Sequence, residues 1–294
     1  MLSLLIPTVA QGLLWALMAL GVYVTFRVLD IADLTVEGSF PLGAATAASM
    51  MVAGFGPLTA LLAAFVAGML AGVVTGLLHT KMKIPALLAG ILTMIALYSV
   101  NLRIMGKANL SLLGVDTTFK IAKSVLDLSM VQTTLVVGLA VTLIVGFFMY
   151  WFFGTQIGAA IRATGFNQQM IRAQGVDTDI TIILGLLLIN GLVAVSGALV
   201  AQSNGFSDVG MGTGTIVIGL ASVIIGEVLF GTRSFKNCLI SVVLGSIVYR
   251  IVIAAVLAMG MPPNDLKLFT SVLVALALSM PLIKAKMGGR KAVR

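Results

Sequence analysis

The feature that most constrains this chain is a series of long apolar runs. A helix needs about 20 mostly apolar residues to cross a bilayer. The 294 residues are 60% hydrophobic, and their mean hydropathy is +1.14. The runs lack the alternation of a membrane barrel strand, so helices are favoured. The sequence excludes a soluble globular protein and predicts an all-α, polytopic membrane protein, with residues 1–294 forming one domain.

The apolar runs predict about nine membrane-spanning helices, within a range of about eight to ten. The longest polar stretch between them, residues 103–131, is expected to be a loop. The predicted spans are 4–26, 38–54, 57–78, 84–102, 132–153, 180–202, 213–230, 237–258 and 266–283.

Lysine and arginine residues predict the orientation, because they are enriched in cytoplasmic loops. If the C-terminus is cytoplasmic, twelve of these residues lie inside and five lie outside. The basic tail 284–294 and the polar segment 154–176 then lie inside, and with nine spans the N-terminus lies outside. An even number of spans would move the N-terminus inside. The net charge of +8 reflects these span ends, so no nucleic-acid partner is expected.

The sequence offers no catalytic or metal-binding pattern, and no cofactor is expected. It has no phosphate-binding Gly-x-x-x-x-Gly-Lys-Ser/Thr loop, so ATP could drive it only through another subunit. His79 is the only histidine and has no histidine, cysteine or carboxylate near it in the sequence. A metal site and a Ser–His–Asp arrangement are therefore excluded.

Segment 154–176 is polar and basic, and it lies between two long apolar runs. Ala159, Arg162 and Ala163 favour a helix, which Gly165 is expected to break. A second short helix is expected to end at Gly175. On composition alone, an ordinary cytoplasmic loop is the simpler interpretation.

The same segment resembles the coupling loop of ABC-importer permeases of the branched-chain amino acid and ribose type. Residues 21–27 and 32–39 resemble the stretch that opens the second core helix of this family, although Glu37 adds one residue and a charge to the pattern. The likeness covers roughly residues 10–285 and is greatest to the subgroup paired with tryptophan- or tyrosine-type binding proteins. The motif is present as Arg162-Ala163, Gly165-Phe166-Asn167, Ala173 and Gly175-Val176.

The resemblance implies a type II-like permease fold in the inner or plasma membrane and a transport subunit that is not itself an enzyme. It also implies a cytoplasmic nucleotide-binding subunit, an extracytoplasmic solute-binding protein and a second permease subunit, in a homodimer. The expected cargo is an aromatic or branched-chain amino acid. The residues expected to couple to the ATPase are Ala159, Arg162, Ala163, Gly165, Asn167, Ala173 and Gly175.

A translocation path is expected near a helix break before residue 38. Asp33, Thr35 and Ser39 have the side chains of a helix start, and such breaks border the substrate path in many transporters. Asn190 and Asn204 are further candidates for the path, although a hydrogen bond between helices accounts for Asn190 equally well.

Three other functions remain open besides import of an amino acid by an ABC system, one of which is a structural membrane scaffold that transports nothing. An ion-coupled secondary transporter would need a carboxylate inside a span, for which Glu227 is the candidate. An ABC permease could instead carry a sugar or a nucleoside. For Glu227 and Arg250, a structural ion pair or a dimer contact is favoured over contact with substrate.

Overall fold

The computed structural model describes residues 2–260 and, beyond them, residues 262, 265, 268–272, 274–276 and 279. Part of the ninth predicted span and the whole basic tail 284–294 lie outside the described residues. The long helices are α1 (Leu2–Tyr23), α2 (Val36–Val52), α3 (Pro57–Thr80), α4 (Ala86–Met105), α6 (Met130–Gly154), α9 (Thr178–Asn204), α10 (Thr215–Phe230) and α11 (Phe235–Ala258).

Each of the first eight predicted spans coincides with one of these helices, which confirms the all-α membrane fold. Among the described residues, seven helices are long and apolar enough to cross a membrane. Helix α2 has 17 residues and is buried along most of its length. The expected number of nine spans is therefore approximate.

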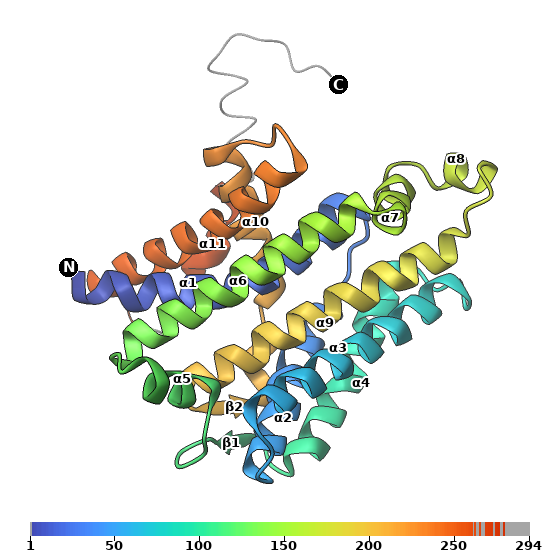
Figure 1. The fold of residues 1–294 in the computed structure, drawn as a ribbon. Helices are drawn as coiled ribbons and strands as arrows, with labels where there is room; N and C mark the ends of the chain where they lie inside the picture. Colours follow the sequence, from blue (N-terminus) through green and yellow to red (C-terminus); the bar gives the residue numbers. More distant parts are fainter. Residues whose placement is uncertain are drawn as a thin grey trace.

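Helices α1 and α9 lie at the centre of the bundle (Figure 1). Helix α9 packs against α2 and α3 on one side, whereas α1 packs against α6 and α11. Glycines allow α9 to approach its neighbours closely, as is common between helices in membranes. A Cβ atom on Gly43 of α2 would lie 1.9 Å from the carbonyl oxygen of Ala194, and one on Gly68 of α3 would lie 2.3 Å from that of Asn190.

Segment 103–131 is more ordered than the predicted loop, and the prediction is wrong there. It contains the end of α4, strand β1 (Asn109–Ser111) and helix α5 (Thr118–Leu126). The side chain of Thr117 accepts a hydrogen bond from the Lys120 amide and caps α5, while Phe119 is fully buried. Strand β1 pairs antiparallel with β2 (Phe206–Asp208), which joins this segment to the turn after α9.

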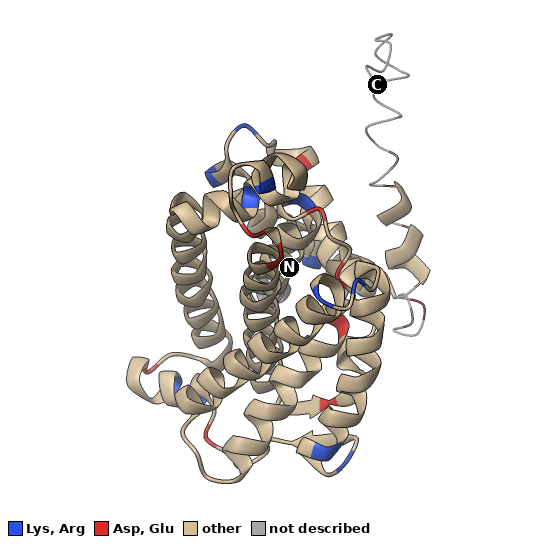
Figure 2. Cartoon of the chain, turned by 90° about the vertical axis from the view of Figure 1, so that its right-hand side faces the viewer, with Lys and Arg blue, Asp and Glu red and all other residues tan. Residues whose placement is uncertain are grey.

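Charged residues lie mostly on turns and helix ends, and the long helices are largely uncharged (Figure 2). Strands β1 and β2 and helix α5 lie at one end of the bundle, and the short helices α7 (Gln156–Phe166) and α8 (Gln168–Ala173) lie at the other (Figure 1). At the end with α7 and α8, ion pairs to Asp179 join the turn at residues 81–83 and helix α8 to the start of α9.

Candidate functional site

The segment predicted to couple to an ATPase forms two short helices, each with its own cap. Thr155 caps α7 by accepting a hydrogen bond from the Gly158 amide. Asn167 caps α8 by accepting one from the Met170 amide. Gly175, with φ of +84°, ends the segment before Asp177 caps α9. The two predicted short helices are confirmed.

The position of the break between the two helices differs from the prediction. Helix α7 continues through Gly165 and ends at Phe166, so Gly165 does not break it. The chain turns at Asn167, whose extended backbone suits a cap residue. Glycine is needed at position 165 because another part of the chain comes very close.

That neighbour is the end of α1, which continues as a short π-helix, η1 (Val24–Val28). A Cβ atom on Gly165 would lie 1.9 Å from the carbonyl oxygen of Val28 and 2.8 Å from Cα of Leu29. Helix α7 is also joined to α9, because the hydroxyls of Thr164 and Thr181 lie 2.9 Å apart. The predicted coupling segment therefore contacts the break between α1 and α2 directly.

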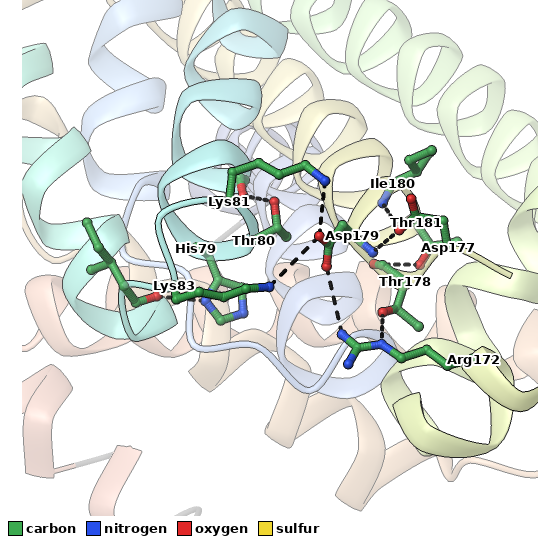
Figure 3. A network of polar contacts seen from close by, with 12 residues as sticks. His79, Thr80, Lys81, Lys83, Arg172, Asp177, Thr178, Asp179, Ile180 and Thr181 are labelled. Carbon is green, nitrogen blue, oxygen red and sulfur yellow. Dashed lines mark hydrogen bonds and ion pairs between the residues drawn. The ribbon is translucent and has the colours of Figure 1, made fainter.

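Helix α8 is held by a cluster of charged side chains around Asp179 in the first turn of α9 (Figure 3). The Asp179 carboxylate lies 3.1 Å from Lys81 Nζ, 3.9 Å from Lys83 Nζ and 3.8 Å from Arg172 Nη2. Arg172 also donates a hydrogen bond to the Thr178 hydroxyl, at 2.6 Å. We call these five residues the Asp179 cluster; sequence reasoning did not single out Asp179, Lys81 or Lys83 for this site.

The predicted coupling residues divide into exposed and inward-facing positions. Gly165 faces η1, and the guanidinium of Arg162 stacks over the Phe235 ring at 5.4 Å from its centroid. Phe166 was not predicted as a site residue, yet it is 89% exposed at the tip of α7. The remaining predicted residues are Ala159, Asn167, Ala173 and Gly175, which are exposed, and Ala163, which is half-buried.

The structure brings together four of the five residues predicted for the path. Asp33 accepts hydrogen bonds from the Thr35 amide at 2.9 Å and from Asn190 Nδ2 at 2.9 Å. Ser39 donates to Asn190 Oδ1 at 2.7 Å. All four side chains are fully buried within the chain. They form a closed set of contacts between the start of α2 and the middle of α9.

These contacts continue into α3 and α4. The Thr35 and Thr75 hydroxyls lie 2.7 Å apart, and Thr75 donates to Thr93 at 2.9 Å. We call the six residues the Asp33 network. Asn204 is not part of it, because it is the exposed last residue of α9.

The start of α2 also contacts the start of α10. One Glu37 carboxylate oxygen accepts a hydrogen bond from the Gly214 amide at 3.0 Å. The chain turns in the same way before α2 and before α10. Asp208 accepts a hydrogen bond from the backbone amide two residues later, as Asp33 does. A cavity of about 370 Å³ adjoins this contact. Its lining includes Glu37, Met94, Tyr98, Ser99, Asn101 and Thr213, from α2, α4 and the turn before α10.

Two charged residues of the predicted spans have partners that the sequence did not identify. Arg27 forms a two-pronged ion pair with Glu227, with Nε 3.0 Å from Oε1. Arg233, which lies six residues after Glu227 in the sequence, forms no ion pair with it among the described residues. Arg250 lies over the Trp15 ring, 4.0 Å from its centroid. Both charged groups therefore have structural contacts within the chain.

Comparison with known proteins agrees with this architecture. A family model described as "Branched-chain amino acid transport system / permease component" matches residues 4–279. A tyrosine transport system permease protein of Clostridioides difficile (strain R20291) is 41% identical over 273 residues, covering 93% of this chain and 90% of the relative. A galactofuranose transporter permease protein of Escherichia coli (strain K12) is 31% identical over 268 residues, covering 90% of this chain and 75% of the relative.

A solved structure of a metal-chelate type ABC transporter in an inward-facing conformation shares the fold. Its TM-score is 0.51 at 15% identity, covering 96% of this chain and 85% of the other. The match to the family extends from the first helix into the last described residues, so it includes both the Asp33 network and the coupling segment. The chain therefore belongs to the branched-chain amino acid transport permease family, the multi-pass membrane subunits of ABC importers that leave ATP hydrolysis to a separate subunit.

Proposed function

We propose that this permease carries an amino acid with an aromatic side chain, such as tyrosine, as a homodimer coupled to its ATPase through α7 and α8. The family supplies the general activity of import driven by a separate ATPase that works with a binding protein. The substrate, the second copy and the roles of individual residues are the proposed steps. The whole of residues 1–294 acts as one permease unit in this proposal.

The contact between Gly165 and Val28 carries the coupling proposal. An ATPase that moves α7 also moves the end of α1, because no space remains for even a methyl group between them. The chain then continues through residues 29–35 to α2, whose start is fixed by the Asp33 network. Closely packed elements transmit such movements, since a packed core does not deform continuously.

Four predicted path residues act in this proposal by holding the start of α2. Asp33, Thr35, Ser39 and Asn190 hydrogen-bond to one another, which leaves them poorly placed to contact a solute. Asn204 remains a candidate for contact at the outer end, since it is exposed.

The cavity beside Glu37 is the proposed contact site for the solute. Among the described residues that line the cavity, Glu37 supplies the only carboxylate, which suits the ammonium group of an amino acid. Asn101 Oδ1 is buried without a hydrogen-bond partner there, so it can accept one from a polar solute. Tyr98 and Met94 provide surface for an aromatic ring. A neutral sugar could donate hydroxyl hydrogen bonds to Glu37 but has no positive charge to pair with it.

A homodimer completes this site in the proposal. The cavity is bordered by Ile95 and Tyr98 of α4, which are 59% and 56% exposed in the single chain. A second copy facing α4 would cover these side chains and close the cavity on its open side. One coupling segment per chain, each facing one nucleotide-binding subunit, fits two identical permeases.

The coupling proposal is tested by Gly165→Val in the complete importer reconstituted in liposomes. Because the new side chain cannot fit beside Val28, we expect uptake to fall about tenfold or more while ATP hydrolysis continues. Gly154→Ala is the matched control, because a Cβ atom on Gly154 meets no atom within 4 Å. If Gly165→Val moves as much solute per ATP as the wild type, the coupling route is wrong.

The substrate proposal is tested by uptake of labelled tyrosine in the same liposomes. We expect uptake to require ATP and to be inhibited by unlabelled phenylalanine or tryptophan, while galactose has no effect. Transport of the sugar in place of tyrosine would contradict the proposed substrate. Uptake that persists without ATP and collapses with a proton or sodium ionophore would support an ion-coupled transporter instead.

A further inference from the structure

A groove between α6 and α11 contains two adjoining cavities. One, of about 680 Å³, lies where α6 ends and α11 begins, and the other, of about 340 Å³, lies along the two helices. Tyr150 and Lys236 line both cavities, so the two form one continuous groove. We call it the α6–α11 groove.

The wider end of the groove is basic and rich in aromatic residues. Arg162 and Lys236 lie in its lining together with Trp151, Thr155 and Ser234. None of the described residues that line this end is acidic. Helix α11 starts here, and its positive dipole end adds to the attraction for an anion.

The narrower part of the groove is almost entirely apolar. Leu20 of α1 lines it and is fully buried, so it forms the floor. Gly146 lies in the wall, and a Cβ atom added there would meet no atom within 4 Å. The missing side chain therefore widens the slot. The other apolar residues that line it include Leu143, Phe147, Leu239, Ile240, Val243 and Leu244.

The chemistry of the groove changes along its length in the order found in a phospholipid. Trp and Tyr side chains are enriched at the level of lipid headgroups. Trp151 and Tyr150 are 59% and 51% exposed beside the basic end, which places that end at the membrane surface. Basic pockets between membrane helices on the cytoplasmic side attract anionic headgroups. An uncharged annular lipid would not need Arg162 and Lys236 at the mouth.

We propose that the α6–α11 groove binds an anionic phospholipid, with its phosphate at Lys236 and Arg162 and an acyl chain in the slot beside Gly146. The bound lipid would contact both α7, through Arg162, and the start of α11. A second copy of this chain is the competing occupant. It is disfavoured because the wide end of the groove would place like charges of the two copies near each other.

The proposal is tested by native mass spectrometry of the purified full-length chain, released from detergent after incubation with phosphatidylglycerol or with phosphatidylcholine. We expect the wild type to retain phosphatidylglycerol and to lose phosphatidylcholine. Lys236→Gln should weaken retention about fivefold, the effect of one basic residue near an anionic lipid surface. Gly146→Leu keeps every charge but fills the slot, and it should weaken retention about tenfold, as expected when two methylene groups lose their burial.

Arg233→Gln is the matched control, because Arg233 lies in the turn before α11 but does not line the groove. We expect this variant to retain phosphatidylglycerol as the wild type does. Equal retention of the two lipids by the wild type would overturn the proposal, as would equal losses from Arg233→Gln and Lys236→Gln. A lipid-free dimer that Gly146→Leu converts to a monomer would also overturn it, because the groove would then be an interface between two copies.

Discussion

The Asp33 network and the Asp179 cluster each centre on one aspartate, but they lie in opposite environments. In the first, the carboxylate is fully buried and accepts hydrogen bonds from the Thr35 amide and from Asn190. No basic residue forms an ion pair with Asp33 among the described residues. In the second, Asp179 faces three cations, and the side chains of Lys81, Lys83 and Arg172 are 58%, 72% and 56% exposed.

The difference in burial predicts different contributions to stability from the two groups of residues. A buried polar group has no water to replace a lost partner, so each contact of the Asp33 network is needed for stability. Exposed ion pairs exchange easily with solvent and contribute little each. The Asp33 network therefore holds the start of α2 by buried contacts, whereas the Asp179 cluster joins α8 to α9 by exposed ones. In the proposed coupling mechanism, α8 is the part that changes position.

If burial makes each contact of the Asp33 network necessary, removing one of its members should lower the stability of the protein clearly. Asn190→Leu keeps the number and branching of the side-chain heavy atoms but removes a donor to Asp33 and the acceptor for Ser39. We expect the free energy of unfolding to fall by about 1–3 kcal/mol, because buried polar groups are left unpaired. The measurement is the apparent Tm of the purified protein in detergent.

Asn204→Leu supplies the matched control for this variant. It is the same substitution on the same helix, but Asn204 is exposed at the end of α9. Its Tm should stay close to that of the wild type. Equal losses of Tm from the two variants would show that burial of the network has no special role in stability.

The Asp33 network also shows what the sequence could and could not predict. Long apolar runs are sufficient to predict eight of the helices, and cap-type residues indicate a helix start near Asp33. Asn190 lies 157 residues after Asp33 in the sequence, and only the packing of α2 against α9 brings the two side chains together. The sequence alone identifies Asn190 as a polar residue within a span and leaves two interpretations open, a hydrogen bond between helices and a place in the path.

Gly165 shows why a local pattern can give the right residue for the wrong reason. Glycine in a polar segment predicts a helix break, because its backbone is flexible. Here the glycine lies within α7 and is required by the approach of Val28, more than 130 residues earlier in the chain. No local signal distinguishes Asp179 as a centre of ion pairs, because its partners Lys81 and Lys83 lie far away in the sequence.

The smallest predicted effect comes from the Asp179 cluster. Asp179→Asn keeps the shape of the side chain but removes the charge that faces Lys81, Lys83 and Arg172. Because the cations are well exposed, we expect a loss of at most about 1 kcal/mol, much less than for Asn190→Leu. The difference from the wild type should shrink further as salt is raised from 0.1 M to 1 M, because the Debye length falls from about 10 Å to about 3 Å.

Lys83→Gln is the control for Asp179→Asn. Lys83 Nζ lies 3.9 Å from the Asp179 carboxylate, the longest of the three ion-pair distances, so its loss should matter least. The Tm of this variant should match that of the wild type at both salt concentrations. If Asp179→Asn lowered the Tm as much as Asn190→Leu at both salt concentrations, the cluster would be part of the rigid framework. Helix α8 would then be fixed to α9 as firmly as α2 is, and movement at the coupling segment would have to pass through α7 alone, by way of Gly165 and Val28.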